Sequence, residues 1–118
     1  PRTRKKNKGG DWRMILQETY ARLQTLGIPV AYRVFKSAQE PPFLVYYLDN
    51  SRKHGADSLN LISDDNIIIE LYTDSKNIAL EKQIESLFSD VELSKIESWI
   101  EDENLLMIAY EFTTINKE

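Results

Sequence analysis

The feature that most constrains the fold is a change in apolar spacing at Gly27. Before it, large apolar residues recur every three or four positions, which predicts an amphipathic helix that begins near Asp11. Gly27 stands where a left-handed residue ends a helix, and Pro29 cannot continue one. After it, the spacing in "VAYRVF" becomes alternate, which predicts a strand over residues 30–35. The helical stripe consists of Trp12, Ile15, Leu16, Tyr20, Leu23 and Leu26.

Further strand-length segments follow. Pro41 and Pro42 lack the amide hydrogen of a ladder, so they belong to the connection "KSAQEPP" that precedes the next strand. "FLVYYLD" is rich in β-forming residues on both faces and predicts a central strand over residues 43–49. The polar residues 50–58 predict a loop. A short strand, a turn at Asp64–Asp65 and a long strand over residues 66–73 are expected after it.

A second helix is predicted in "SKNIALEKQIESLFSD", with Ser75 or Asn77 as its N-cap. Glu81 and Glu85 are expected to point away from the core. The expected buried face consists of Ile78, Leu80, Ile84, Leu87 and Phe88.

Residues 92–114 fit two patterns. Their apolar spacing satisfies one long helix, but Leu106, Ile108, Tyr110 and Phe112 also alternate strictly, and "EDEN" has the composition of a turn. We therefore expect a hairpin with strands over 92–100 and 104–114. The whole order predicts an α+β fold: a mostly antiparallel sheet of four to five strands with two helices packed on one face. A compact domain of this length would have a radius of gyration of about 13 Å.

Charge divides the chain into an arm and a body. Residues 1–13 carry six basic side chains and one acid, a net charge of +5, so the remainder carries −9 of the total of −4. We expect residues 1–13 to be a flexible basic arm and residues 14–118 a single α+β domain. The arm is either a leader outside the folded domain, the reading we favour, or a segment that contacts DNA or RNA. Its candidate phosphate contacts are Arg2, Arg4, Lys5, Lys6 and Lys8.

The sequence offers little catalytic chemistry. There is no cysteine, and the single histidine, His54, lies in a polar segment with no nearby partner for acid–base work. The acids at 64–65 and 101–103 lack the spacing of a cation-binding loop and fit turns instead. No phosphate loop, dinucleotide fingerprint, nucleophile elbow or zinc spacing is present. We expect no enzyme, no metal and no cofactor.

Tyrosines on the predicted strands are the remaining candidates. Aromatic residues on a sheet serve either as an RNA-stacking platform or as protein–protein contacts. Few basic residues lie near them, so we favour a core and subunit-interface role. The candidate subunit or partner surface is Tyr32, Arg33, Tyr46, Tyr47 and Tyr72.

Three segments together carry a family resemblance: "LGIPVAY" after the first helix, with "PPFLVYY"; "IELYTD" leading into the second helix; and a terminal "YEF". Over residues 14–114 the chain resembles the small head–tail joining, tail-completion and tail-terminator proteins of long-tailed bacteriophages and of prophages in Gram-positive bacteria. These motifs are structural rather than chemical.

The resemblance implies a virion structural protein, made in the bacterial host cytoplasm, that forms a homo-oligomeric ring, commonly of six copies, at the head–tail junction. Such a ring terminates or completes the tail. Its partners would be other copies of itself and other tail or connector proteins. DNA would pass through without specific binding, and no membrane, cofactor or catalytic residue is implied. The alternative is a small nucleic-acid-binding or regulatory module that uses the basic arm.

Overall fold

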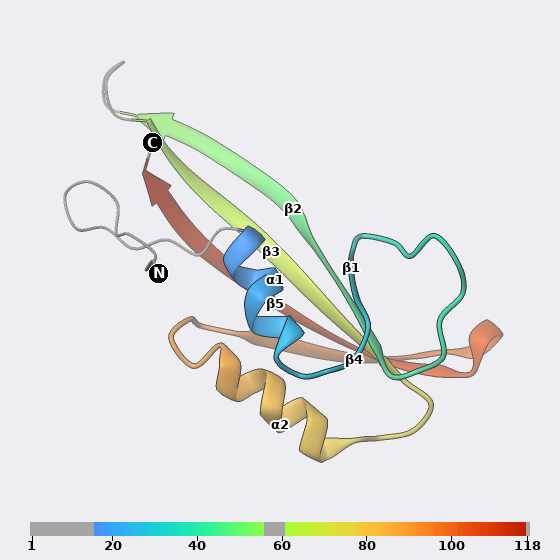
Figure 1. Cartoon of the computed structure of the whole chain (residues 1–118). Coiled ribbons are helices and arrows are strands. Elements are labelled where there is room, and N and C mark those ends of the chain that lie inside the picture. Colours follow the sequence, from blue (N-terminus) through green and yellow to red (C-terminus); the bar gives the residue numbers. More distant parts are fainter. Residues whose placement is uncertain (1–15, 56–60, 118) are drawn as a thin grey trace.

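A computed structural model describes residues 16–55 and 61–117 of the chain. Two helices cover one face of a five-stranded sheet, as the alternation and helix patterns predict (Figure 1). The elements are α1 (Leu16–Gln24), β1 (Val30–Tyr32), β2 (Phe43–Gly55), β3 (Leu61–Thr73), α2 (Ile78–Leu87), β4 (Ser94–Ile100), a short 3-10 turn (Glu101–Glu103) and β5 (Leu105–Lys117).

The sheet is mixed but mostly antiparallel, with strand order β1-β2-β3-β5-β4. Only the short β1 runs parallel to its neighbour, β2. The β4–β5 hairpin confirms the prediction for residues 92–114. Its chain reversal uses Asn104 in the left-handed conformation, with φ of 53°, a conformation that asparagine tolerates better than most residues.

One-sided burial fixes the strand register. Alternate residues of β3 and β5 face the helices, and the opposite alternate set faces away, so a slip by one residue would exchange the two faces. α1 contributes Leu23, α2 contributes Leu80 and Ile84, and Phe88 follows directly after α2. The sheet residues of this apolar core are Leu44, Tyr46, Ile67, Ile69, Leu71, Leu106, Ile108, Tyr110 and Phe112.

Both helix ends that carry a sequence signal form as predicted. Gly27 has a φ of 78° and follows the last turn of α1, and Asn77 caps α2 by accepting a hydrogen bond from the Leu80 amide at 3.1 Å. Trp12 and Ile15, which the sequence assigns to the first helix, lie outside the described residues. Leu80, Ile84 and Phe88 are buried as expected, whereas Ile78 is exposed and Leu87 is only partly buried.

Arg22 ties the two helices together. Its guanidinium donates to both carboxylate oxygens of Asp90 at 2.8 and 2.9 Å and to the carbonyl of Leu87 at 2.8 Å. The same group lies 5.3 Å from the centre of the Phe88 ring. A planar, bidentate contact of this kind fixes the orientation of α1 against the end of α2.

Three predictions about strand ends were wrong. The strand predicted over residues 30–35 stops at Tyr32, because Arg33 takes a positive φ of 68° and turns the chain into the connection that leads to the cis Pro41–Pro42 bond. Residues 50–55 extend β2 instead of forming a loop. β3 continues through Asp64 and Asp65, where a turn was expected.

Cross-strand polar contacts explain the two extensions. Ser51, Ser63 and Asn116 all donate to the carboxylate of Asp65, and His54 lies 3.4 Å from Asp64. Polar residues therefore pair across these strands where no apolar alternation marks a strand. The three 13-residue strands lengthen the molecule to 49 × 30 × 27 Å, and the radius of gyration is 15.8 Å instead of about 13 Å.

Removing a core side chain should cost far more than removing an exposed one. We expect Ile69→Ala to lower the free energy of unfolding by about 2–5 kcal/mol, because it leaves a cavity beneath both helices. Ile78→Ala, on the exposed surface, should change it by less than about 0.5 kcal/mol. Urea denaturation of the two variants measures both values, and equal losses would contradict the assigned core.

Candidate assembly surface

The five predicted surface residues fall on both faces of the sheet. Tyr32 and Tyr46 lie on the face that α1 covers: their rings meet edge to face at 5.2 Å, and Tyr20 stacks on Tyr46 at 5.8 Å. Tyr46 is buried. Tyr47 and Tyr72 lie on the opposite face, which no described helix covers, and the Arg33 guanidinium lies 4.6 Å from the centre of the Tyr47 ring. The structure therefore does not gather the five into one patch.

The uncovered face is built around Glu70. This carboxylate accepts one hydrogen bond from Tyr47 Oη at 2.6 Å and one from Tyr72 Oη at 2.7 Å. Burial and the hydrogen bond to Glu70 raise the pKa of Tyr47 to about 12 and raise the pKa of Tyr72 as well. Both phenols are therefore donors at neutral pH, and Glu70 acts as a fixed acceptor.

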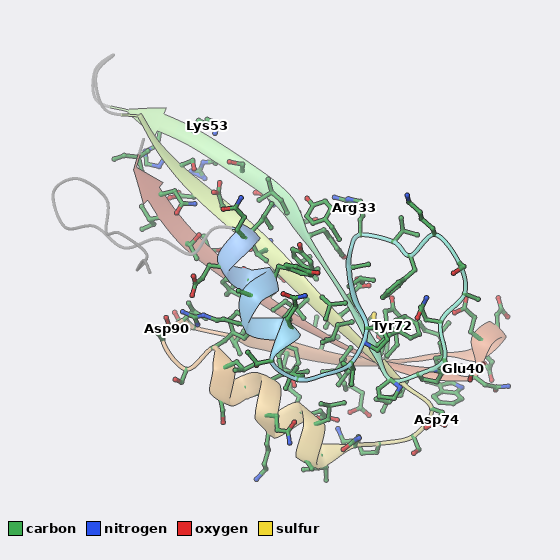
Figure 2. All side chains as sticks on the ribbon, viewed as in Figure 1. Arg33, Glu40, Lys53, Tyr72, Asp74 and Asp90 are labelled. Atoms are coloured by element: carbon green, nitrogen blue, oxygen red, sulfur yellow. The ribbon has the colours of Figure 1, made fainter. Side chains whose placement is uncertain are left out.

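Shallow hollows lie beside this group. One, of about 440 Å³, is lined by residues 33–39 of the connection after β1 and by Tyr72, which Figure 2 labels at a separate place from Arg33. Its lining mixes Phe35 and Phe43 with charges of both signs, including Lys36 and Glu103. A smaller one, of about 180 Å³, is lined by Ile68, Ile96 and Ala109 and by two acids, Glu70 and Glu111. The larger hollow has no excess of basic side chains and the smaller one is apolar with acids, so both suit protein contact better than phosphate binding.

Side chains of Tyr32 and Arg33 cap the edge of β2. β1 ends at Tyr32, and the next outward main-chain groups of β2 belong to Leu48. The Leu48 amide donates to Tyr32 Oη at 3.2 Å, and its carbonyl accepts from the Arg33 guanidinium at 3.2 Å. These two side chains thus make the hydrogen bonds to Leu48 that the main chain of a longer β1 would otherwise make. Sequence reasoning chose Tyr32 and Arg33 as surface candidates but offered no signal for this role.

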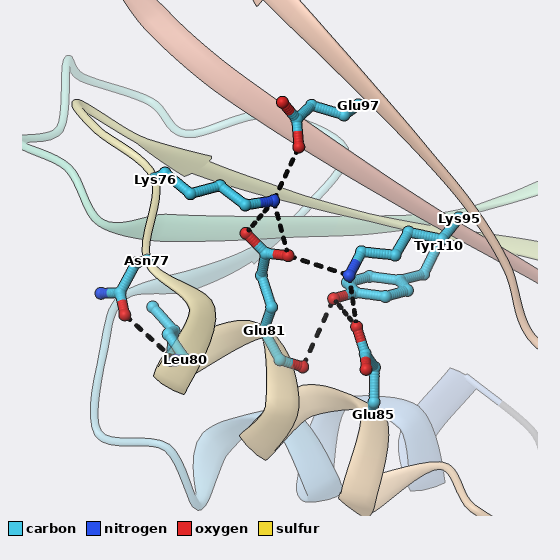
Figure 3. Close-up of polar contacts among 8 residues, drawn as sticks. All are labelled: Lys76, Asn77, Leu80, Glu81, Glu85, Lys95, Glu97 and Tyr110. Carbon is cyan, nitrogen blue, oxygen red and sulfur yellow. Dashed lines mark hydrogen bonds and ion pairs between the residues drawn. The ribbon is translucent and has the colours of Figure 1, made fainter.

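An ion-pair network around one buried carboxylate, that of Glu81, fixes the edge strand β4 to α2 (Figure 3). Glu81 is only 3% exposed, which corrects the prediction that it points away from the core. Its carboxylate meets Lys76 at 3.0 Å and Lys95, from β4, at 2.9 Å. Lys95 also pairs with Glu85 at 2.7 Å, and Glu85 accepts from Tyr110 Oη at 2.8 Å. A helical pattern cannot signal this, because the partners come from a loop and from two strands.

Charge pairing sets the protonation of the network. Burial alone would raise the pKa of Glu81, but hydrogen bonds from Lys95 and Lys76 outweigh it and lower the pKa below its ordinary value of 4.5. The hydrogen bond from Lys95 likewise lowers the pKa of Glu85. Because the folded state lowers these pKa values, the stability they add is present above about pH 4.5 and is lost as the pH falls below it.

His54 lies beside Asp64, an acid of the neighbouring strand β3. His54 lies in β2 rather than in a loop, with an exposed imidazole, and the Asp64 side chain is partly exposed. Among residues 16–55 and 61–117, no group of three or more His, Cys, Asp or Glu side chains is placed to hold a metal ion. No helix within these ranges is long and apolar enough to cross a membrane. The arm residues Arg2, Arg4, Lys5, Lys6 and Lys8 lie outside the described residues.

The fold has a match among solved structures. It is similar to a chain in the virion of a native gene transfer agent (GTA) particle, with a TM-score of 0.57 and 13% sequence identity. The match covers 87% of this chain and 89% of the other, so the two share a fold over nearly their whole lengths. No protein-family model and no curated protein sequence matches the chain.

The Glu81 network gives a testable contribution to stability. We expect Glu81→Gln to lower the free energy of unfolding at pH 7 by about 1–3 kcal/mol, because two lysines lose their shared buried partner. Glu97→Gln removes a half-exposed partner of Lys76 and should cost about 0.5 kcal/mol or less. Urea denaturation from pH 3 to pH 7 measures both. The Glu81→Gln profile should fall less below pH 4.5 than that of the unmodified chain, and identical profiles would contradict the assignment.

Proposed function

We propose that this chain is a structural subunit of a phage-like virion, which forms a ring at the head–tail junction and there terminates or completes the tail. The observation that carries the proposal is the fold shared with a virion chain over nearly the whole length of both proteins. The family resemblance of residues 14–114 supports the junction role. A homo-oligomer with other tail or connector proteins as neighbours follows from that role.

The geometry of the described residues is consistent with a subunit rather than a catalyst. Glu70 is held by two tyrosines, and the buried Glu81 by two lysines, so both carboxylates already serve structural contacts. Exposed apolar side chains instead lie on several elements. They include Val34, Ile78, Ile96, Trp99 and Ile115. An exposed apolar side chain can contribute to a protein–protein contact where a partner covers it.

Self-association is the first consequence to measure. We expect light scattering over a concentration series to show a closed oligomer, or a climb toward one, both for the full chain and for residues 14–118. Negative-stain electron microscopy of the oligomer should then show rings. A strict monomer at every concentration, in the presence of tail tubes as well as alone, would overturn the proposal.

The basic arm supports a second candidate function, a nucleic-acid-binding module. Its phosphate contacts would be Arg2, Arg4, Lys5, Lys6 and Lys8, against an acidic remainder that repels phosphate. This version predicts DNA binding that weakens by orders of magnitude between about 50 and 200 mM salt and disappears in residues 14–118. Titration of labelled DNA by fluorescence anisotropy measures both effects. Equal binding by the two forms would exclude the arm.

A further inference from the structure

Three long strands run past both helices and past both edge strands. β2, β3 and β5 continue together beyond the ends of α1 and β1 (Figure 1). β1 pairs with β2 only as far as Tyr46, and β4 pairs with β5 only as far as Glu111. Within the described part of the chain, no strand lies beside β2 over residues 49–55 or beside β5 over residues 112–117. A three-stranded ribbon with two such edges is a template for adding strands.

Hydrogen-bonding direction can be followed across the sheet from strand register. The Tyr46 carbonyl accepts from the Arg33 amide, so Tyr46 directs its main chain toward β1. The main-chain N–H and C=O groups of successive residues in a strand point to opposite sides, and residues paired across two strands either both point toward each other or both point away. Followed through the register of β2, β3 and β5, this alternation directs the main-chain groups of Glu111, Thr113 and Ile115 away from β3. Glu111 meets β4, whereas Thr113 and Ile115 lie beyond its end. β5 therefore presents outward main-chain groups beside an exposed apolar side chain, Ile115.

The two edges differ in charge. A groove of about 400 Å³ lies where β4 ends beside β5, and its lining includes Glu92 and Glu111. The far half of β2 carries Arg52, Lys53 and His54, with Lys53 near the end of the ribbon (Figure 2). Like charges disfavour pairing of two β2 edges. Over residues 112–117, β5 carries a single charged residue, Lys117, so it meets less repulsion from the β2 edge than a second β2 edge would.

We infer that the edge of β5 over residues 112–117 pairs with the edge of β2 over residues 49–55 in a second copy of this chain. The inference rests on the proposed ring and names its interface. The contact is head-to-tail, since it joins two different edges of the same molecule, and such contacts generate rings when the rotation closes. A contact between two β5 edges would instead stop at a dimer.

Rotational symmetry gives the expected alignment. Copies in a ring are related by rotation without translation along the ring axis. If that axis is parallel to the strands, the same residue row of the sheet lies at the same height along the axis in every copy. Arg52, Asp64 and Ile115 form one row on the uncovered face. Arg52 of one copy should thus lie near Ile115 of the next, with Asn50 and His54 as its neighbours on the same face.

Disulfide trapping tests the interface without background, because the chain contains no cysteine. Ile115→Cys is mixed with a second preparation that carries Asn50→Cys, Arg52→Cys or His54→Cys, and mild oxidation follows. We expect a heterotypic dimer from at least one of these mixtures, because paired strands bring Cα atoms within disulfide range. A chain with both Ile115→Cys and the reactive β2 substitution should give a ladder of covalent oligomers. Ile78→Cys is the matched control, since Ile78 is similarly exposed, 57% against 66% for Ile115, and should give no such dimer.

Light scattering of Ile115→Lys and Ile78→Lys supplies the second readout. Ile115→Lys should reduce the solution mass to that of a monomer, whereas Ile78→Lys should leave the oligomer intact. An oligomer that persists in Ile115→Lys and gives no β5–β2 disulfide would overturn the interface while leaving the ring proposal standing. Disulfides formed by Ile115→Cys alone would overturn it in favour of a twofold contact. A chain that never self-associates would overturn both.

Discussion

The structure depends on one apolar layer between two helices and the middle of a sheet. Ile67, Ile69 and Leu71 of β3 lie at its centre, between β2 and β5, and both helices pack over the strands on this side. Because these residues alternate, the layer selects one register for three strands at once. The sheet edges and the uncovered face take their positions from that register.

Charge adds to this layer at its periphery. Arg22 joins α1 to the end of α2, and Glu81 joins α2 to β4 through Lys95. Both contacts cross between elements that are distant in sequence, and both use groups whose pKa values shift toward the charged form. The edge strand β4 is therefore fixed by ion pairs as well as by its hydrogen bonds to β5. β1, by contrast, pairs with β2 through three residues and is supplemented by the side chains of Tyr32 and Arg33.

Sequence patterns predicted the fold where burial is one-sided. The stripe ending at Gly27, the alternation around Ile108 and the Asn77 cap all have local causes, so they were readable in advance. The ends of β2 and β3 were not, because Ser51, Asp64 and Asp65 pair across strands without any apolar period. Burial of Glu81 escaped prediction for a similar reason: its lysine partners lie outside its own helix. Tyr32 and Arg33 were singled out as surface residues, but their contact with Leu48 depends on where β1 stops.

That contact has a consequence for any strand added to the β2 edge. Tyr32 and Arg33 already occupy the amide and carbonyl of Leu48, so an incoming main chain finds its first open position beyond the irregularity between Leu48 and Asn50. The register of an added strand along β2 is then determined by Tyr32 and Arg33 rather than by the incoming chain. The side chains of Tyr32 and Arg33 therefore define where an added strand can begin. Only the part of β2 beyond Leu48 is available to that strand.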